Sequence, residues 1–291
     1  MKKLSRQIMA LCSVFGFASG VMAEDCKPAP DCADLGFTQN AADCSGDALK
    51  CPWDLTKAAC KAGDESEDIK EDIKPVPCAV GSILGNDQLC YSPDTGTPDG
   101  VKPVGIVFDT INKLAVALTN VNKDGSACDT WSLMLMSTAY SSTSEYNIPA
   151  LANCTGSAGG ASLLSCGADG RANTTAILNC GNICGTTPAA TAANSYEPSG
   201  CSKDFCKKTK WFLPSMRDLR TLYRVKFYVN TSLTRMADFG AKTLYENGGG
   251  HWSSTQSETG YMWGVRMDTG EESPNYRNGM SNAVVRPVVK Y

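Results

Sequence analysis

The residues that could carry chemistry in this chain of 291 residues are 15 cysteines and a single histidine, His251. Cysteine thiols act as nucleophiles, metal ligands or redox pairs, and they also close structural disulfides. One histidine excludes zinc sites built on a histidine pair, and a catalytic serine or cysteine would have to use His251 as its base. Ser253 and Ser254 follow closely, but strand neighbours point to opposite faces and no Gly-x-Ser-x-Gly turn is present. We therefore interpret His251 as structural and assign no catalytic residue.

The compartment in which the chain folds decides between these uses of cysteine. Residues 1–23 have basic residues, then an apolar run, then Val21-Met22-Ala23, which is the layout of a secretory signal peptide. Its removal takes away Cys12 and three positive charges, leaving 14 cysteines and a net charge of −6. This acidic balance argues against nucleic acid as a partner, and no later stretch is apolar for long enough to span a bilayer. We expect a secreted, periplasmic or surface protein with its cysteines in disulfides.

The distribution of the cysteines predicts two parts. Five cysteines precede an acidic linker or loop over 61–77, and Cys78 makes their number even. The simplest partition is a three-bridge module over 24–78, followed by a domain over 79–291 that holds four bridges. Connectivity within each set stays open. The residues assigned to disulfides are Cys26, Cys32, Cys44, Cys51, Cys60, Cys78, Cys90, Cys128, Cys154, Cys166, Cys180, Cys184, Cys201 and Cys206.

Three patterns resemble metal sites, but none is complete. Segment 120–125 offers oxygen atoms at alternate positions, yet Trp131 stands where a calcium loop needs a bidentate glutamate, so we interpret it as a turn. The short spacings Cys180-x3-Cys184 and Cys201-x4-Cys206 favour disulfides in an exported chain. An oxygen-rich group without a defined ligand geometry consists of Asp268, Glu271, Glu272 and Asn275. We predict neither a metal nor another cofactor.

The remaining patterns predict a mixed α+β domain. Apolar runs at 104–109 and 114–118 indicate a hairpin, and the polar composition of 140–210 indicates loops and short helices. A capping box of Ser215 and Asp218 predicts a helix over 215–226, and a second, weaker helix is expected over 231–240. Alternation over 261–267 predicts a strand. A final strand over 283–289 contains Pro287, which favours an edge position or a strand end.

A polar loop over 269–282 is the candidate binding surface. It contains Asn275, Tyr276, Arg277 and Asn278, and Arg266 lies on the strand before it. Tyrosine, arginine and asparagine supply rigid contact area and adaptable hydrogen bonds, which recognition loops favour. An ordinary long hairpin loop is the alternative.

Several motifs in the C-terminal half resemble those of the Lcl C-terminal domain family. They are Trp211-Phe-Leu-Pro214-Ser215 with Asp218-Leu219, His251-Trp252-Ser253-Ser254-Thr255, Tyr261-x-Trp263, Gly270 and Val285-Arg286-Pro287-Val288. That family occurs in bacterial surface and exported proteins. Its fold is similar to the C-type-lectin-like fold of formylglycine-generating enzymes and retroelement-diversified receptors. The resemblance covers about 79–291.

This resemblance implies a C-type-lectin-like domain with a small twisted antiparallel sheet in which the chain ends meet, and ligand contacts on loops near the C-terminal strands; the two helices predicted above would belong to it. It also implies architectural roles for Trp211, Pro214, Trp252, Trp263 and Arg286. The Trp-Asn-Asp calcium signature of sugar-binding C-type lectins is absent, and no cysteine follows Cys206 to serve as in formylglycine-generating enzymes.

The function expected from this resemblance is non-catalytic adhesion to an extracellular protein, glycan or matrix ligand. One alternative is a formylglycine-generating-like or thiol-redox enzyme that uses Cys180/Cys184 or Cys201/Cys206. Another is a structural subunit of a surface appendage.

Overall fold

The structure is a computed structural model, and it describes residues 73–128, 132–139, 147–244, 250–258, 260–277 and 283–291, with two short strands before them. Its contacts divide the chain into Met1–Lys70 and Glu71–Tyr291. In the first unit, β1 (Thr38–Gln39) pairs antiparallel with β2 (Cys60–Lys61). The predicted signal peptide, the side chains of the cysteines before Cys78, the acidic residues up to Asp72, Trp131 and Asn278 lie outside the described residues.

The second unit is a mixed α+β structure, as predicted. Its strands are β3 (Ile83–Gly85), β4 (Cys90–Tyr91), β5 (Pro103–Asp109), β6 (Leu114–Ala117), β7 (Asn120–Val121), β8 (Ala127–Cys128), β9 (Trp211–Phe212), β10 (Gly250–Gln256), β11 (Tyr261–Arg266), β12 (Glu272–Tyr276), β13 (Ala283–Val284) and β14 (Val288–Lys290). Its α-helices are α2 (Gly170–Leu178), α3 (Pro188–Ser195) and α4 (Met216–Arg235), and short 3-10 helices cover Ala161–Leu164, Gly181–Ile183, Asp204–Cys206 and Ala237–Phe239.

A six-stranded antiparallel sheet forms the centre of this unit, in the order β4-β3-β5-β6-β14-β9. The predicted hairpin is its β5–β6 pair. Alternate residues serve different cores: Phe108 and Val116 join one hydrophobic cluster, whereas Ala115 joins the other. Burial on both faces explains why these strands read as nearly continuous apolar runs.

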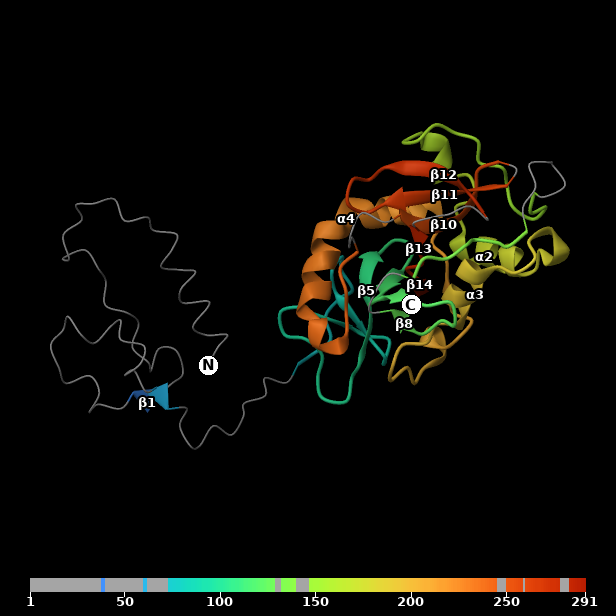
Figure 1. Ribbon diagram of the computed structural model, residues 1–291. Helices are drawn as coiled ribbons and strands as arrows, with labels where there is room; N and C mark the ends of the chain where they lie inside the picture. Colours follow the sequence, from blue (N-terminus) through green and yellow to red (C-terminus); the bar gives the residue numbers. More distant parts are fainter. Residues whose placement is uncertain are drawn as a thin grey trace, which may run out of the picture. The chain divides into compact units, whose positions relative to one another are not determined.

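A second sheet has the order β12-β11-β10-β13, with β13 parallel to β10 and the other pairs antiparallel. Figure 1 shows α4 on one side of the strands and α2 and α3 on the other. Trp263 of β11 packs in the cluster that contains α4 residues, and its neighbour Met262 packs in the cluster that contains α3 residues. The two helical layers therefore bury both faces of β11.

Helix α4 begins at the predicted capping box. The Ser215 hydroxyl accepts the Asp218 N–H at 3.2 Å, and the Asp218 carboxylate accepts the Ser215 N–H at 2.9 Å. The prediction of a second helix over 231–240 is wrong, because α4 runs unbroken to Arg235. Val229 and Leu233 continue its buried face through the expected break. With α2 and α3 there are three described α-helices, rather than the two that were predicted. None of the described helices is long and apolar enough to cross a membrane.

Residues 283–290 do not form one strand. Chain direction changes at Arg286-Pro287, so β13 lies at the edge of the four-stranded sheet and β14 lies between β6 and β9. The prediction that Pro287 marks a strand end is confirmed. A residue without an N–H cannot complete a ladder hydrogen bond at that position.

Four disulfides join described residues: Cys78–Cys90, Cys154–Cys166, Cys180–Cys184 and Cys201–Cys206. The first corrects the predicted partition, in which Cys78 belonged to the N-terminal module. The Val76 N–H donates a hydrogen bond to the carbonyl of Cys90 in β4, so Cys78 is held against the sheet of the second unit. Cys128 is buried at the end of β8.

Candidate functional site

An aromatic pair lies at one end of the β11–β12 hairpin. Tyr261 is directly opposite Tyr276 in the ladder, and their ring centroids are 4.2 Å apart with a tilt of 37°. Among the described strands β12 pairs with β11 alone, so it forms the edge of its sheet. The side chain of Tyr276 remains 45% exposed. Two rings held together on a regular strand pair give a rigid apolar contact surface with hydroxyl groups at its rim.

Polar side chains continue along the same edge strand. Asn275 is half-buried, and its amide donates to the backbone oxygen of Ser273 at 3.1 Å and to its hydroxyl at 3.3 Å. Pro274 between them is exposed. Residues 272–276 are therefore a strand, and the prediction of a single polar loop over 269–282 is wrong. The sequence did not predict this strand because Glu, Ser, Pro and Asn are not β-branched and have little preference for strands.

Arg266 lies at the other end of β11, about 17 Å along the strand from Tyr261. Its guanidinium binds the Asp268 carboxylate at 2.7 Å and 3.2 Å, and Glu271 lies 3.6 Å away. This pairing raises the pKa of Arg266 and lowers that of Asp268 to about 2, chiefly through their hydrogen bond. Arg266 therefore does not join Tyr276 in one site, and Asp268 is engaged by arginine.

Arg277 is fully buried, which corrects its assignment to an exposed binding loop. Its carbonyl accepts the N–H groups of Met136 and Ser137 at 2.9 and 3.0 Å, and its own N–H donates to Gly260 at 2.9 Å. The guanidinium Nη1 lies 3.6 Å from Sγ of Cys184. Burial lowers the pKa of Arg277, but a guanidinium remains protonated in proteins.

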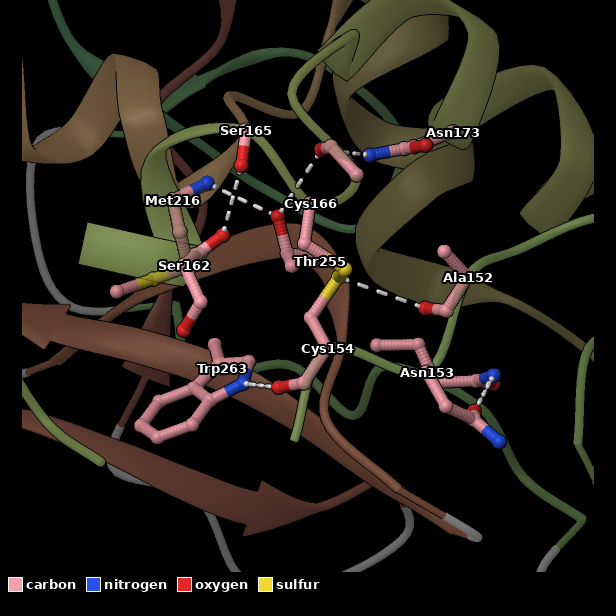
Figure 2. Close-up of a disulfide and its surroundings, with 12 residues drawn as sticks. Ala152, Asn153, Cys154, Ser162, Ser165, Cys166, Asn173, Met216, Thr255 and Trp263 are labelled. Atoms are coloured by element: carbon pink, nitrogen blue, oxygen red, sulfur yellow. Dashed lines mark hydrogen bonds between the residues drawn. A yellow bond between two sulfur atoms is a disulfide. The ribbon is translucent and has the colours of Figure 1, made fainter. Parts of the chain in front are cut away.

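The three motif tryptophans are all buried, and each indole N–H donates to a backbone carbonyl outside the strands. Trp211 binds Cys206 at 2.8 Å, Trp252 binds Met134 at 2.7 Å and Trp263 binds Cys154 at 3.0 Å. Figure 2 shows the last of these beside the Cys154–Cys166 bridge. Two of the indoles therefore anchor cysteines of disulfide-closed loops to the sheets.

Pro214 and Arg286 connect segments that are distant in sequence. Pro214 is buried, and its carbonyl accepts the Ser254 N–H at 2.8 Å. The Arg286 side chain donates to the carbonyls of Ala117 and Leu118, both at 2.8 Å, and of Lys242 at 2.7 Å. Backbone oxygens thus receive most of the hydrogen bonds of a buried guanidinium.

His251 lies on β10 with only 2% of its surface exposed. Neither ring nitrogen has a hydrogen-bond partner among the described residues. Burial, and secondarily the Arg286 charge, lower the pKa of His251 to about 3, while Asp268 has a smaller opposing effect. The ring is therefore neutral at physiological pH and removed from the surface, where a general base would need to be.

The oxygen-rich segments hold their own chain. Asp124 of the β7–β8 turn accepts the N–H and hydroxyl of Ser126 at 2.9 and 2.7 Å, and these bonds lower its pKa. Glu272 is paired with Arg220. Among the described residues, no cluster of three histidine, cysteine or acidic side chains is arranged to bind a metal.

No protein-family model, no curated protein and no solved structure matches this chain. The edge of β11–β12 is therefore a candidate on geometry alone.

Sequence reasoning missed a cavity of about 430 Å³ beside α2. The residues that line it are Ile148, Pro149, Ala150, Ala172, Asn173, Thr175, Ala176, Asn179 and Cys180. The sequence predicted a disulfide for Cys180 but not the cavity beside it. Nothing in the sequence could indicate that Arg277, 93 residues away from Cys184, packs against the same disulfide.

Proposed function

We propose that this chain is an exported bacterial binding protein of the Lcl C-terminal domain type. In this proposal, its C-type-lectin-like domain over 79–291 recognises an extracellular protein, glycan or matrix ligand without catalysis. The observation that carries the proposal is the Tyr261–Tyr276 pair on the sheet edge, with Tyr276 exposed. The rings offer an apolar face to a sugar ring or a side chain, and Asn275 offers an amide beside them.

The support beneath this edge lowers the entropy cost of binding, because the contacting groups are already ordered. β12 is held by the ladder to β11 and by the pair of Glu272 with Arg220 of α4. The motif residues Trp211, Trp252, Trp263 and Arg286 are buried, in keeping with the architectural roles that the resemblance implies. β3 and β14, near the two ends of the domain, belong to one sheet.

A glycan array and a panel of immobilised extracellular-matrix proteins, probed with the mature chain from Glu24 onward, test the proposal. For a probe that binds, we expect Tyr276→Ala to weaken affinity by about tenfold or more, as loss of an aromatic anchor does. Phe227→Ala is the matched control, because Phe227 is an aromatic residue 75% exposed on α4. Equal affinities of Tyr276→Ala and the unaltered chain would place the site elsewhere. Absence of binding to every probe would count against the function itself.

A further inference from the structure

We propose that the Cys180–Cys184 disulfide is a thiol-exchange site. A low-molecular-weight thiol reaches Cys180 through the cavity beside α2, and Cys184 leaves as a thiolate against Arg277. This chemistry is independent of the β11–β12 edge, since it uses other atoms of the second unit.

Reduction of the Cys180–Cys184 disulfide frees only a short loop of the chain. The two cysteines are four residues apart, whereas Cys78–Cys90 and Cys154–Cys166 each span 12. A short closed loop removes less entropy from the unfolded chain, so its loss costs less stability. The flanking helices have their own supports. The Asp169 carboxylate caps α2 by accepting the Ala172 N–H at 3.0 Å, and Thr174 on α2 accepts the Leu213 N–H at 3.0 Å.

The two sulfur atoms differ in access. Cys180 is half-buried and lines the cavity of about 430 Å³, a volume in the range of small-molecule sites. Cys184 has no exposed surface. An external thiolate can therefore attack Cys180 and not Cys184, which fixes the order of bond formation and bond cleavage.

The surroundings also suit the reduced products. Arg277 Nη1 lies 3.6 Å from Sγ of Cys184, and a neighbouring cation stabilises a thiolate and makes it a better leaving group. Sγ of Cys180 lies 2.7 Å from the carbonyl oxygen of Ile177. A disulfide sulfur carries no proton, so this contact becomes a hydrogen bond only after reduction, when the Cys180 thiol can donate.

The reaction balances with two equivalents of thiol. The first thiolate bonds to Cys180 Sγ, the Cys180–Cys184 bond breaks, and its electron pair remains on Cys184. A second thiolate attacks the added sulfur of the mixed disulfide, releases the oxidised small molecule and leaves Cys180 as a thiolate that takes up a proton. The protein disulfide is reduced by two electrons, and the two thiols are oxidised to one disulfide.

Cys201–Cys206 is a matched internal control. Its cysteines are five residues apart, and both are buried. Each sulfur lies 3.4 Å from the carbonyl oxygen of Lys203. The partial negative charge of a carbonyl oxygen disfavours a thiolate. This bridge therefore has a similarly small loop but lacks the sulfur–guanidinium contact that Cys184 makes with Arg277, and the Lys207 ammonium donates to the Cys201 carbonyl at 2.8 Å.

Glutathione at graded ratios of reduced to oxidised form tests the proposal on the mature chain. After acid quenching and alkylation, peptide mass analysis reports each disulfide separately. We expect Cys180–Cys184 to be half-reduced at a glutathione ratio about tenfold or more below that for Cys201–Cys206, since one unit of thiolate pKa is tenfold. We also expect the glutathione adduct on Cys180. Reduction of both bridges at one ratio, resistance of Cys180–Cys184 throughout the folded state, or an adduct on Cys184 would overturn the proposal.

Substitutions of Arg277 test the role of the cation. Arg277→Met should raise the ratio needed for half-reduction by about tenfold, and Arg277→Lys should raise it less because it keeps the charge. An unchanged ratio in a folded Arg277→Met chain would contradict the assignment. Circular dichroism and a cooperative thermal transition establish folding. If Arg277→Met does not fold, the comparison of the two disulfides in the unaltered chain still decides the matter.

Discussion

Arg220 of α4 and Glu272 of β12 form a two-point ion pair, in which Nη2 and Oε2 are 2.6 Å apart. Both side chains are less than one tenth exposed. The pair also binds a loop: Arg220 donates to the Gly160 carbonyl at 2.6 Å, and Glu272 accepts the Gly159 N–H at 2.8 Å. One buried charge pair thus holds the outer strand of the four-stranded sheet, the long helix and the 159–160 loop together.

Removal of the Glu272 charge should therefore be costly. We expect Glu272→Gln to lower the free energy of unfolding by about 3–5 kcal/mol, because it leaves Arg220 buried without its counter-charge. Asp268→Asn, which breaks the more exposed pair with Arg266, should cost much less, because solvent screens that pair. Urea denaturation of both variants measures the difference, and equal costs would show that burial of the first pair is unimportant.

The same pair should make stability sensitive to acid. Burial alone would raise the pKa of Glu272, but the bonds from Arg220 and Gly159 bring it below the ordinary 4.5. Its contribution is thus complete above pH 4.5 and is lost as the pH falls through the lower folded value. Urea midpoints below pH 4.5 should fall more steeply for the unaltered chain than for Glu272→Gln. Parallel curves would contradict this assignment.

His251 should give a second dependence on pH, in a window that extends to higher pH than that of Glu272. Its folded pKa of about 3 lies below the ordinary 6.5, so the unfolded chain binds the proton first. The free energy of unfolding should therefore rise from about pH 3 to 6.5, by at most about 1.4 kcal/mol per pH unit, and level off above; between pH 5 and 6.5 this rise lies outside the Glu272 window. In His251→Leu this slope should disappear. A slope that survives in the variant would have to come from another group.

Arg286 should be among the least replaceable residues of the fold. Arg286→Met removes the side-chain donor of the Ala117, Leu118 and Lys242 carbonyls, although Leu118 still accepts the Lys242 N–H. This change should lower the free energy of unfolding by about 2 kcal/mol or more. Arg286→Lys should recover only part of this loss, since an ammonium lacks the planar fork of donors. Chemical denaturation of the two variants makes the comparison. Equal stability of Arg286→Lys and the unaltered chain would mean that charge alone suffices.

The indole of Trp263 should contribute to the free energy of unfolding through its hydrogen bond as well as through its apolar contacts. Trp263→Phe deprives the Cys154 carbonyl of its donor in a buried setting, so we expect a loss of about 1–3 kcal/mol beyond the smaller contact area. Tyr223→Phe removes an exposed bond to the Thr269 carbonyl and should cost about 1 kcal/mol or less. Thermal unfolding followed by near-ultraviolet circular dichroism compares them.

Elements that depend on short stretches of sequence were predicted correctly. The apolar runs gave the β5–β6 hairpin, the Ser215–Asp218 box gave the start of α4, and Pro287 gave a strand end. Failures occurred where long-range contacts decide. α4 continues past residue 226 because Val229 and Leu233 find partners in the core, and β12 forms because β11 provides a ladder for a sequence with little strand preference.

The candidate site divides in the same manner. Tyr276 could be selected from residue type and lies exposed on the edge strand. Arg277, the next residue, is also of a type that recognition loops favour. Its side chain is nevertheless buried and packs against Cys184. Counting cysteines could not predict the disulfide pairing either. A boundary after Cys78 leaves an even number of cysteines on each side, yet Cys78 pairs with Cys90 across that boundary.

The place of β14 between β6 and β9 bears on when this unit can fold. β6 cannot pair with β14 until residues 288–290 have been synthesised, which happens after nearly all the rest of this unit. Until then the central sheet is split, and the pairing that closes it has a very large sequence separation, which slows folding. The central sheet of this unit is therefore completed only when residues 288–290 join it, so its last pairing step is a non-local one.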